Sequence, residues 1–198
     1  MADLSLYNGP VQFDGDVTVG GPATFNGNVK LQGNSGTAPG AGITDGSNTI
    51  CKVSVLREGS LITTRIVVDM TDLESVTGDE KVIGTGTGPA FLTKITTAVN
   101  GTIYGGICNV IESLATGQTN IDLKSSASAV AAKGDAASGG DGFTELFAGG
   151  GALNNTNNSY KTFSEVTADH HLYLVTGASG TADTYSAGKF VITLLGTA

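Results

Sequence analysis

A tandem repeat between Gly9 and Gly33 restricts the fold of this chain more than any other feature. Residues 9–19 and 21–31 are offset by 12 positions (21 − 9), and the matching pairs are Pro10 and Pro22, Phe13 and Phe25, Gly15 and Gly27, and Val17 and Val29. The first unit contains Asp-Gly and the second Asn-Gly, which favour tight turns because glycine accepts positive φ angles. Each unit ends in alternating apolar and polar residues, the period of a half-buried strand. The repeat therefore predicts two strand–turn–strand units.

Two such units are too small to bury their apolar side chains alone, because short repeats are stable only when neighbours stack on them. We therefore predict that three chains wrap their repeats together into a homotrimeric collar. The residues expected in its shared interior are Phe13, Val17, Val19, Phe25, Val29 and Leu31. The alternative is that this arm pairs with the β domain of its own chain or lies flat on a partner.

The texture of the sequence changes after the repeat and suggests three parts. Residues 1–33 form the arm, residues 34–48 are small, polar and Gly-rich and are expected to be a linker, and residues 49–198 carry strand-like runs. Glycine makes up 30 of the 198 residues, and tryptophan is absent. A glycine share about twice the usual one favours short strands joined by tight turns over long helices.

Alternating and β-branched runs predict about eight strands in the C-terminal part, with turn residues between them and no regular helix. The runs span residues 50–56, 61–69, 81–83, 90–96, 102–111, 120–124, 143–147, 172–176 and 188–195. This pattern is typical of an all-β protein, and we predict an antiparallel β-sandwich, jelly-roll-like, preceded by the Gly-punctuated β-repeat arm.

Three of these runs carry more detailed predictions. Asn100-Gly101 is the strongest hairpin signal in the chain and predicts that the strand before it pairs with the strand after it. Residues 120–124 alternate as expected for an exposed strand. Residues 188–195 have so few polar side chains that we expect a central strand covered on both faces.

No segment carries a convincing catalytic or metal-binding pattern, and we predict a protein that is not an enzyme and has no cofactor. Asp169-His170-His171 is expected to be a turn into a strand, because neighbouring residues of a strand point to opposite faces and cannot easily share a metal. Asp14-Gly15-Asp16 lacks the spaced glutamate of a calcium loop.

Two further candidates have structural explanations. Gly84–Pro89 resembles a phosphate-binding loop, but the sequence after it predicts a strand where such a loop needs a helix. Cys51 and Cys108 are expected to be buried thiols, and a disulfide between them stays open if their strands are neighbours.

The net charge of −8 argues against nucleic acid as a partner, since nucleic-acid binding needs a basic footprint. The scattered Lys and Arg residues also argue against an anionic membrane surface. The first six residues do not form a secretory signal, so we expect the chain to be made in a cytoplasm.

An arm of short Gly-punctuated repeats, a linker and a jelly-roll-like β domain together resemble the decoration (cement) proteins on the heads of tailed bacteriophages. The Gly-, Thr- and Ala-rich texture and the runs 172–177 and 190–196 are similar to small structural proteins of marine and cyanobacterial phages. The resemblance implies a homotrimer that binds the major capsid protein on the outer surface of the virion and needs no ligand.

Two other functions remain open at this stage. The repeated Phe-Asp/Asn-Gly-Asp/Asn-Val motif is also similar to repeats of trimeric tail fibres, which implies a tail-fibre or host-attachment module. Such a module is expected to expose aromatic side chains in the loops 125–142 and 148–159. A carbohydrate-binding β-sandwich is the third alternative.

Overall fold

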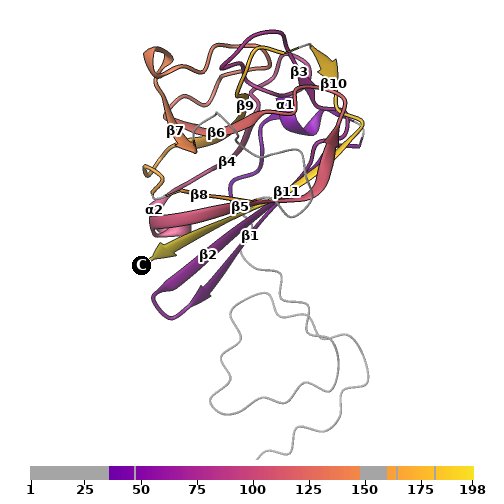
Figure 1. Ribbon diagram of the computed structural model, residues 1–198. Coiled ribbons are helices and arrows are strands. Elements are labelled where there is room, and N and C mark those ends of the chain that lie inside the picture. Colours follow the sequence, from indigo (N-terminus) through magenta and orange to yellow (C-terminus); the bar gives the residue numbers. More distant parts are fainter. Residues whose placement is uncertain (1–35, 47, 148–159, 164, 181) are drawn as a thin grey trace, which may run out of the picture. The chain divides into compact units, whose positions relative to one another are not determined.

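The computed structural model describes residues 36–46, 48–147, 160–163, 165–180 and 182–198, and most of these form or connect β-strands (Figure 1). The strands are β1 (Ile50–Glu58), β2 (Leu61–Asp69), β3 (Glu74–Ser75), β4 (Phe91–Lys94), β5 (Thr102–Ala115), β6 (Ile121–Ser126), β7 (Phe143–Phe147), β8 (Tyr160–Phe163), β9 (His171–Thr176), β10 (Asp183–Thr184) and β11 (Ala187–Thr197). The helical turns in the described residues are α1 (Ala41–Thr44), α2 (Thr97–Asn100) and the 3-10 turn η1 (Gly139–Asp141).

Two antiparallel sheets face each other across one hydrophobic core. The large sheet has the order β1-β2-β11-β5-β8, and the small sheet has the order β4-β9-β6-β7. In Figure 1 the small sheet lies above the large one. The core between them is built from apolar residues that alternate along the strands, such as Ile66 and Val68 of β2 and Leu172 and Leu174 of β9. The predicted all-β, sandwich-like architecture is confirmed.

The strand pairs are nested, as in a single long hairpin that has been folded over. β2 pairs with β11, β3 with β10, β4 with β9, β5 with β8, and β6 with β7. β1 pairs with the free side of β2. Consecutive strands therefore often lie in different sheets, and the chain crosses the sandwich between them.

The hairpin predicted around Asn100-Gly101 is wrong, because β4 pairs with β9 and β5 pairs with β11 and β8. The buried Asn100 side chain accepts a hydrogen bond from the Thr96 amide at 2.9 Å and donates one to Thr64 Oγ1 at 2.8 Å. These bonds hold α2 as a tight crossing from the small sheet to the large one. Gly101 has a φ of 70°, which a residue without a side chain adopts readily, and this conformation belongs to the crossing rather than to a hairpin.

The prediction that residues 120–124 form an exposed strand is also wrong, because every residue of β6 is buried. One face of β6 packs into the core through Leu123. The other face is covered by loop segments of the same chain: Lys124 Nζ contacts Glu80 and donates to the carbonyl of Ala137 at 3.2 Å. The lysine that suggested exposure is thus buried and paired with a glutamate of another segment.

Residues 36–46 pack against the sandwich. Ile43 of α1 is fully buried, and the amide of Gly42 donates to Pro89 O at 2.8 Å. A Cβ atom on Gly42 would lie 2.3 Å from Gly88 O, so the close approach of the two backbones requires glycine. The packed domain therefore includes residues from the range 34–48 that the sequence suggested as a linker.

The substitution Asn100→Ala is expected to destabilise the protein by about 2 kcal/mol, because it leaves the Thr96 amide and the Thr64 hydroxyl without a partner. Chemical denaturation followed by circular dichroism measures this change. The matched control is Thr97→Ala, an exposed residue of the same turn, which should alter stability by less than about 0.5 kcal/mol. Equal stability of the two variants would contradict the role assigned to Asn100.

Candidate interaction surface

The two sheets differ in how their outer faces are covered. All residues of β6 and β9, the middle strands of the small sheet, are buried, and the Tyr173 hydroxyl donates to Ser128 O of a covering loop at 2.7 Å. In the large sheet, exposed and covered residues alternate along β1 and β2. The outer face of the large sheet is therefore the sheet surface that the described residues leave accessible.

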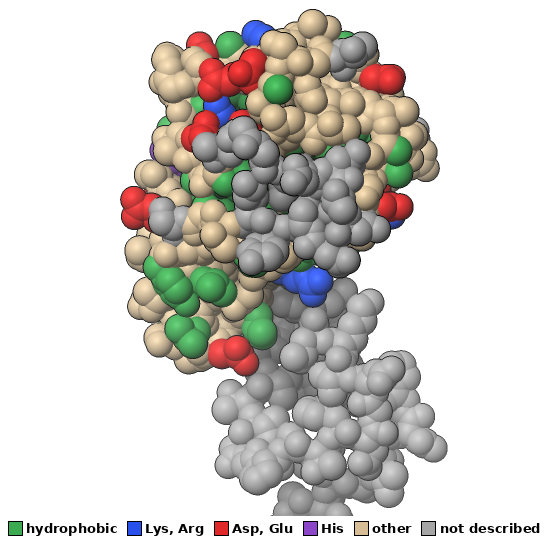
Figure 2. All heavy atoms as spheres, in the orientation of Figure 1, with side chains coloured by type: hydrophobic (Ala, Val, Ile, Leu, Met, Phe, Trp, Pro, Cys, Tyr) green, Lys and Arg blue, Asp and Glu red, His purple; other side chains and the backbone are tan. Residues whose placement is uncertain are grey.

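This accessible face carries an unusual group of large apolar side chains, which we call the apolar patch. It consists of Leu56, Leu61, Tyr104 and Leu195, whose exposed fractions are 50%, 55%, 55% and 37%. Figure 2 shows hydrophobic side chains gathered at the end of the large sheet near the β1–β2 turn. Single exposed apolar residues are ordinary on a soluble protein, but a contiguous group typically marks an interaction site.

The strand register explains why these side chains lie together. Leu56 of β1 is opposite Thr63 of β2, and Thr63 is opposite Leu195 of β11. Between the pairs Leu195–Gly105 and Gly196–Ile103, Tyr104 is the extra residue of a β-bulge. A bulge re-aims the side chain at its site, and this one leaves the Tyr104 ring exposed beside Leu195.

Two cations lie on the same sheet face as the patch, further along the strands, without an ion pair among the described residues. They are Lys52 of β1 and Arg65 of β2, and both occupy outward positions, because they are an even number of residues from Leu56 and Leu61. At the other end of the same face, Lys189 pairs with Asp69 at 3.4 Å and with Glu112 at 2.5 Å. At one end of the sheet, Lys189 is thus paired with carboxylates. Toward the patch, Lys52 and Arg65 have no ion pair among the described residues, and the carboxylate of Glu58 lies opposite Leu61.

The histidine pair shows the geometry of a turn into a strand, as predicted. Asp169 has a φ of 62°, and His171 begins β9 with its ring 4.8 Å from the ring of Phe91. His170 Nδ1 lies 3.2 Å from Ser125 Oγ, but Ser125 is fully buried, and Asp169 pairs with Lys94 instead. The Ser125 hydroxyl beside this pair is therefore not accessible as a nucleophile.

The two cysteines are separate free thiols. Cys51 lies on β1 and Cys108 on β5, and β2 and β11 stand between these strands. Burial raises the pKa of both thiols to about 12, so neither is a nucleophile at neutral pH. The prediction of buried thiols is confirmed for Cys108, and Cys51 is half-buried.

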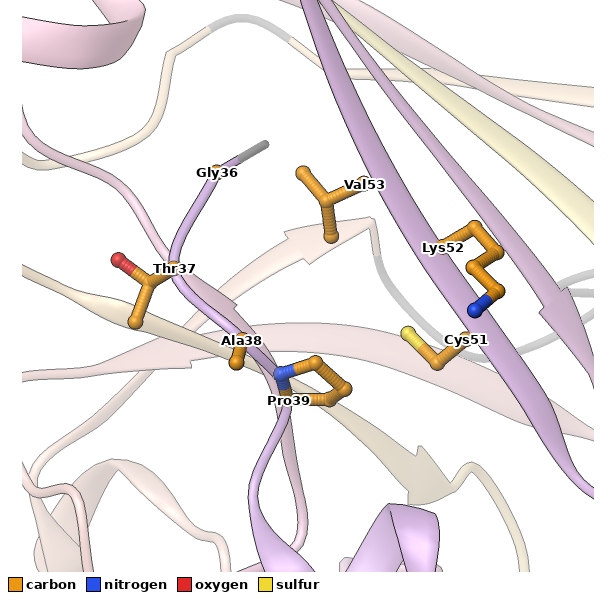
Figure 3. A pocket seen from close by; sticks show the side chains of 7 residues that line it. All are labelled: Gly36, Thr37, Ala38, Pro39, Cys51, Lys52 and Val53. Carbon is orange, nitrogen blue, oxygen red and sulfur yellow. The ribbon is translucent and has the colours of Figure 1, made fainter. Parts of the chain in front are cut away.

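A small cavity of about 220 Å³ separates the inner side of β1 from residues 36–39 (Figure 3). Cys51 directs its sulfur toward this segment, and Val53 lines the same side. The volume is below that of ordinary ligand pockets, which start at roughly 300 Å³. The loop Gly84–Pro89 leads into β4, so the helix that a phosphate-binding loop requires does not follow it.

The covered side of the small sheet contains a buried carboxyl group whose charged form is unfavourable. Asp122 is 3% exposed, and its Oδ1 has no hydrogen-bond partner among the described residues. Burial, together with the nearby Glu145, Asp79 and Glu80, raises the pKa of Asp122 to about 6, although Lys124 opposes the shift. This carboxyl therefore costs stability when it ionises.

Several predicted site residues lie outside the described residues. These are the six residues assigned to the collar interior, Phe13, Val17, Val19, Phe25, Val29 and Leu31, together with Asp14–Asp16. Of the aromatic residues next to the two long loops, Phe143 and Phe147 are buried at 7% and 5% exposure. They are thus unavailable for the glycan stacking that an attachment module requires.

Sequence reasoning missed the apolar patch. The residues 188–195 do form a central strand, but Leu195 is exposed, so the expectation that both faces are covered is wrong at this position. A signal was present in the predicted strands at 50–56 and 61–69. Ile50, Leu56 and Leu61 occupy positions of the face that carries Lys52, Ser54 and Arg65, where a solvated strand would be polar throughout.

Comparison of this chain with protein-family models, with curated proteins and with solved structures gave no match. Within the described ranges, no helix is long and apolar enough to cross a membrane. The same residues include no group of three or more His, Cys, Asp or Glu side chains arranged to hold a metal ion.

Asp122→Asn is expected to stabilise the protein at pH 8 by about 1 to 3 kcal/mol. The folded-state pKa of about 6 lies above the ordinary value of 3.8, so the native protein loses stability as pH rises between these values and stays lower above them. The advantage of the variant should vanish at pH 4. Urea denaturation at both pH values measures it.

The exposed residue Asp45 provides the control for this experiment. Asp45→Asn, a change at an exposed surface position, should alter stability by less than about 0.5 kcal/mol. A pH-independent effect of Asp122→Asn would show that burial does not raise the pKa of this carboxyl group.

Proposed function

We propose that this chain is a homotrimeric decoration protein that binds the outer surface of a bacteriophage head and stabilises the shell. The observation that carries the proposal is the apolar patch on the one sheet face that the described residues leave open. A small domain with a fully buried core and a separate exposed apolar face is suited to binding another protein surface.

The strand order supports a jelly roll as the fold of the domain. With β1 set aside, a long hairpin that pairs β2 with β11, β4 with β9, β5 with β8 and β6 with β7 gives a jelly roll when it is rolled into two sheets. The small pair of β3 and β10 lies where this ribbon passes from one sheet to the other. Jelly rolls are common in viral structural proteins and also in lectins, so this support concerns architecture.

The repeat arm supplies the proposed trimer. Three copies hold three binding faces together, so weak individual contacts add through a high effective concentration. A protein that binds only the assembled shell stabilises that shell by mass action. Both effects require a structural surface and no chemical step.

Immunogold labelling of virions with an antibody to this chain, viewed by electron microscopy, tests the proposal. Gold over the head is the expected result. Gold confined to the tail would favour the tail-fibre or attachment module, and the absence of gold from particles would contradict a virion function of either kind.

The double substitution Phe13→Asp with Phe25→Asp is expected to dissociate the trimer at least partly, because two carboxylates per chain would enter the shared apolar interior of the collar. Native mass spectrometry of the full chain measures the ratio of trimer to monomer. The unfolding of the β domain should not change, because the proposal places both residues in the collar.

The matched control carries the same charges at two polar positions of the repeat, Thr18→Asp with Thr24→Asp. This variant should keep the trimer. A native chain that is monomeric, or a trimer unaffected by the phenylalanine substitutions, would contradict the collar.

A further inference from the structure

We infer that the apolar patch is the surface that docks on the capsid, and that the partner surface there presents apolar side chains together with carboxylates. This inference rests on the proposed function and adds the binding face and the chemistry of the partner.

The first argument is the asymmetry of the sandwich. The outer side of the small sheet is closed by the chain itself, which buries Lys124 against Glu80 and the carbonyl of Ala137. Among the described residues, the outer side of the large sheet is uncovered at the patch and exposes more than a third of each patch side chain. An antiparallel sheet with one solvated face normally places polar residues there, so Leu56, Leu61 and Leu195 are out of place unless a partner covers them.

The second argument is charge. The chain has a net charge of −8, yet Lys52 and Arg65 on the face of the patch, and Arg57 next to Leu56, have no ion pair among the described residues. Glu58, opposite Leu61, is one carboxylate beside these three cations. Lys189 on the same face, by contrast, pairs with two carboxylates of its own chain. Cations left free beside an apolar surface favour a partner of opposite sign, because complementary charges guide association and fix its register.

A second copy of this chain fits the patch less well. In a two-fold contact the same patch meets itself, which would bring Lys52 and Arg65 of both copies into one interface. Burying like charges is costly unless each has a partner, and Glu58 supplies only one carboxylate per chain for these two cations. A contact between the patch and the opposite face of the sandwich would instead stack copies without closing a ring, whereas the proposed trimer is closed.

Footprinting with hydroxyl radicals tests the inference on the full chain, both free and bound to virus particles that carry it. The peptides that contain Leu56, Leu61, Tyr104 and Leu195 should lose reactivity on the particle. Val130 is the matched control, because it is 74% exposed and belongs to a loop on the small-sheet side. Its peptide should react equally in both states.

A charge reversal tests the chemistry of the partner. Lys52→Glu with Arg65→Glu should reduce binding to particles that lack the chain by at least about tenfold, and the remaining binding should depend less on salt. Lys81→Glu, a cation of the small-sheet side without an ion pair among the described residues, should bind like the native chain. Circular dichroism should show that all variants are folded, since Lys52 and Arg65 are exposed and Lys81 is only half-buried.

The outcomes separate this inference from the proposed function. If particles carry the chain but protect Val130 and leave the patch reactive, the docking face is wrong and the decoration function stands. A patch already protected in the free trimer would show a contact between copies. Binding of the chain to vesicles of phosphatidylserine and phosphatidylcholine, without binding to particles, would replace the capsid by an anionic membrane. If no particle carries the chain, the function itself fails.

Discussion

The antiparallel ladder between β2 and β11 is the contact on which the rest of the domain depends. It runs from the pair Leu61–Thr197 to the pair Asp69–Lys189 and so joins the beginning of the domain to its end. Every later strand pair lies inside the loop that this ladder closes. The closure is entropically costly because more than a hundred residues separate the partners, and the apolar contacts of Ile66 and Ile192 in the core must offset it.

The sequence predicted local strands well, because the alternation of side chains depends only on neighbouring residues. The predicted run 61–69 matches β2, and 143–147 matches β7. It predicted pairing poorly at Asn100-Gly101. Gly101 has a positive φ, but the buried amide of Asn100 decides the partner, and it bonds to Thr64 of the large sheet. A hairpin signal therefore specifies a change of direction, whereas the tertiary contact specifies which strand follows.

The open and closed faces are also tertiary properties, and this explains both errors about burial. The residues 120–124 alternate like an exposed strand, yet Lys124 is buried because Glu80 and Glu145 approach it from other segments. Leu195 belongs to an apolar run, yet it is exposed because no described segment covers the large sheet at that point. Composition alone therefore cannot tell which polar residue is buried with an ion-pair partner and which apolar residue is exposed.

The same asymmetry connects the stability of the domain to its proposed role. On the covered side of the small sheet, charged groups are buried and the ionised form of Asp122 is unfavourable. The contacts on that side hold the covering loops in one arrangement. On the open side, the side chains rest on a regular ladder that needs no partner to remain folded. A rigid sheet that is already formed loses little conformational freedom when it binds, and this favours affinity from a small contact. If three such sheets are held together by their arms, each contact can be weak while the assembly stays bound.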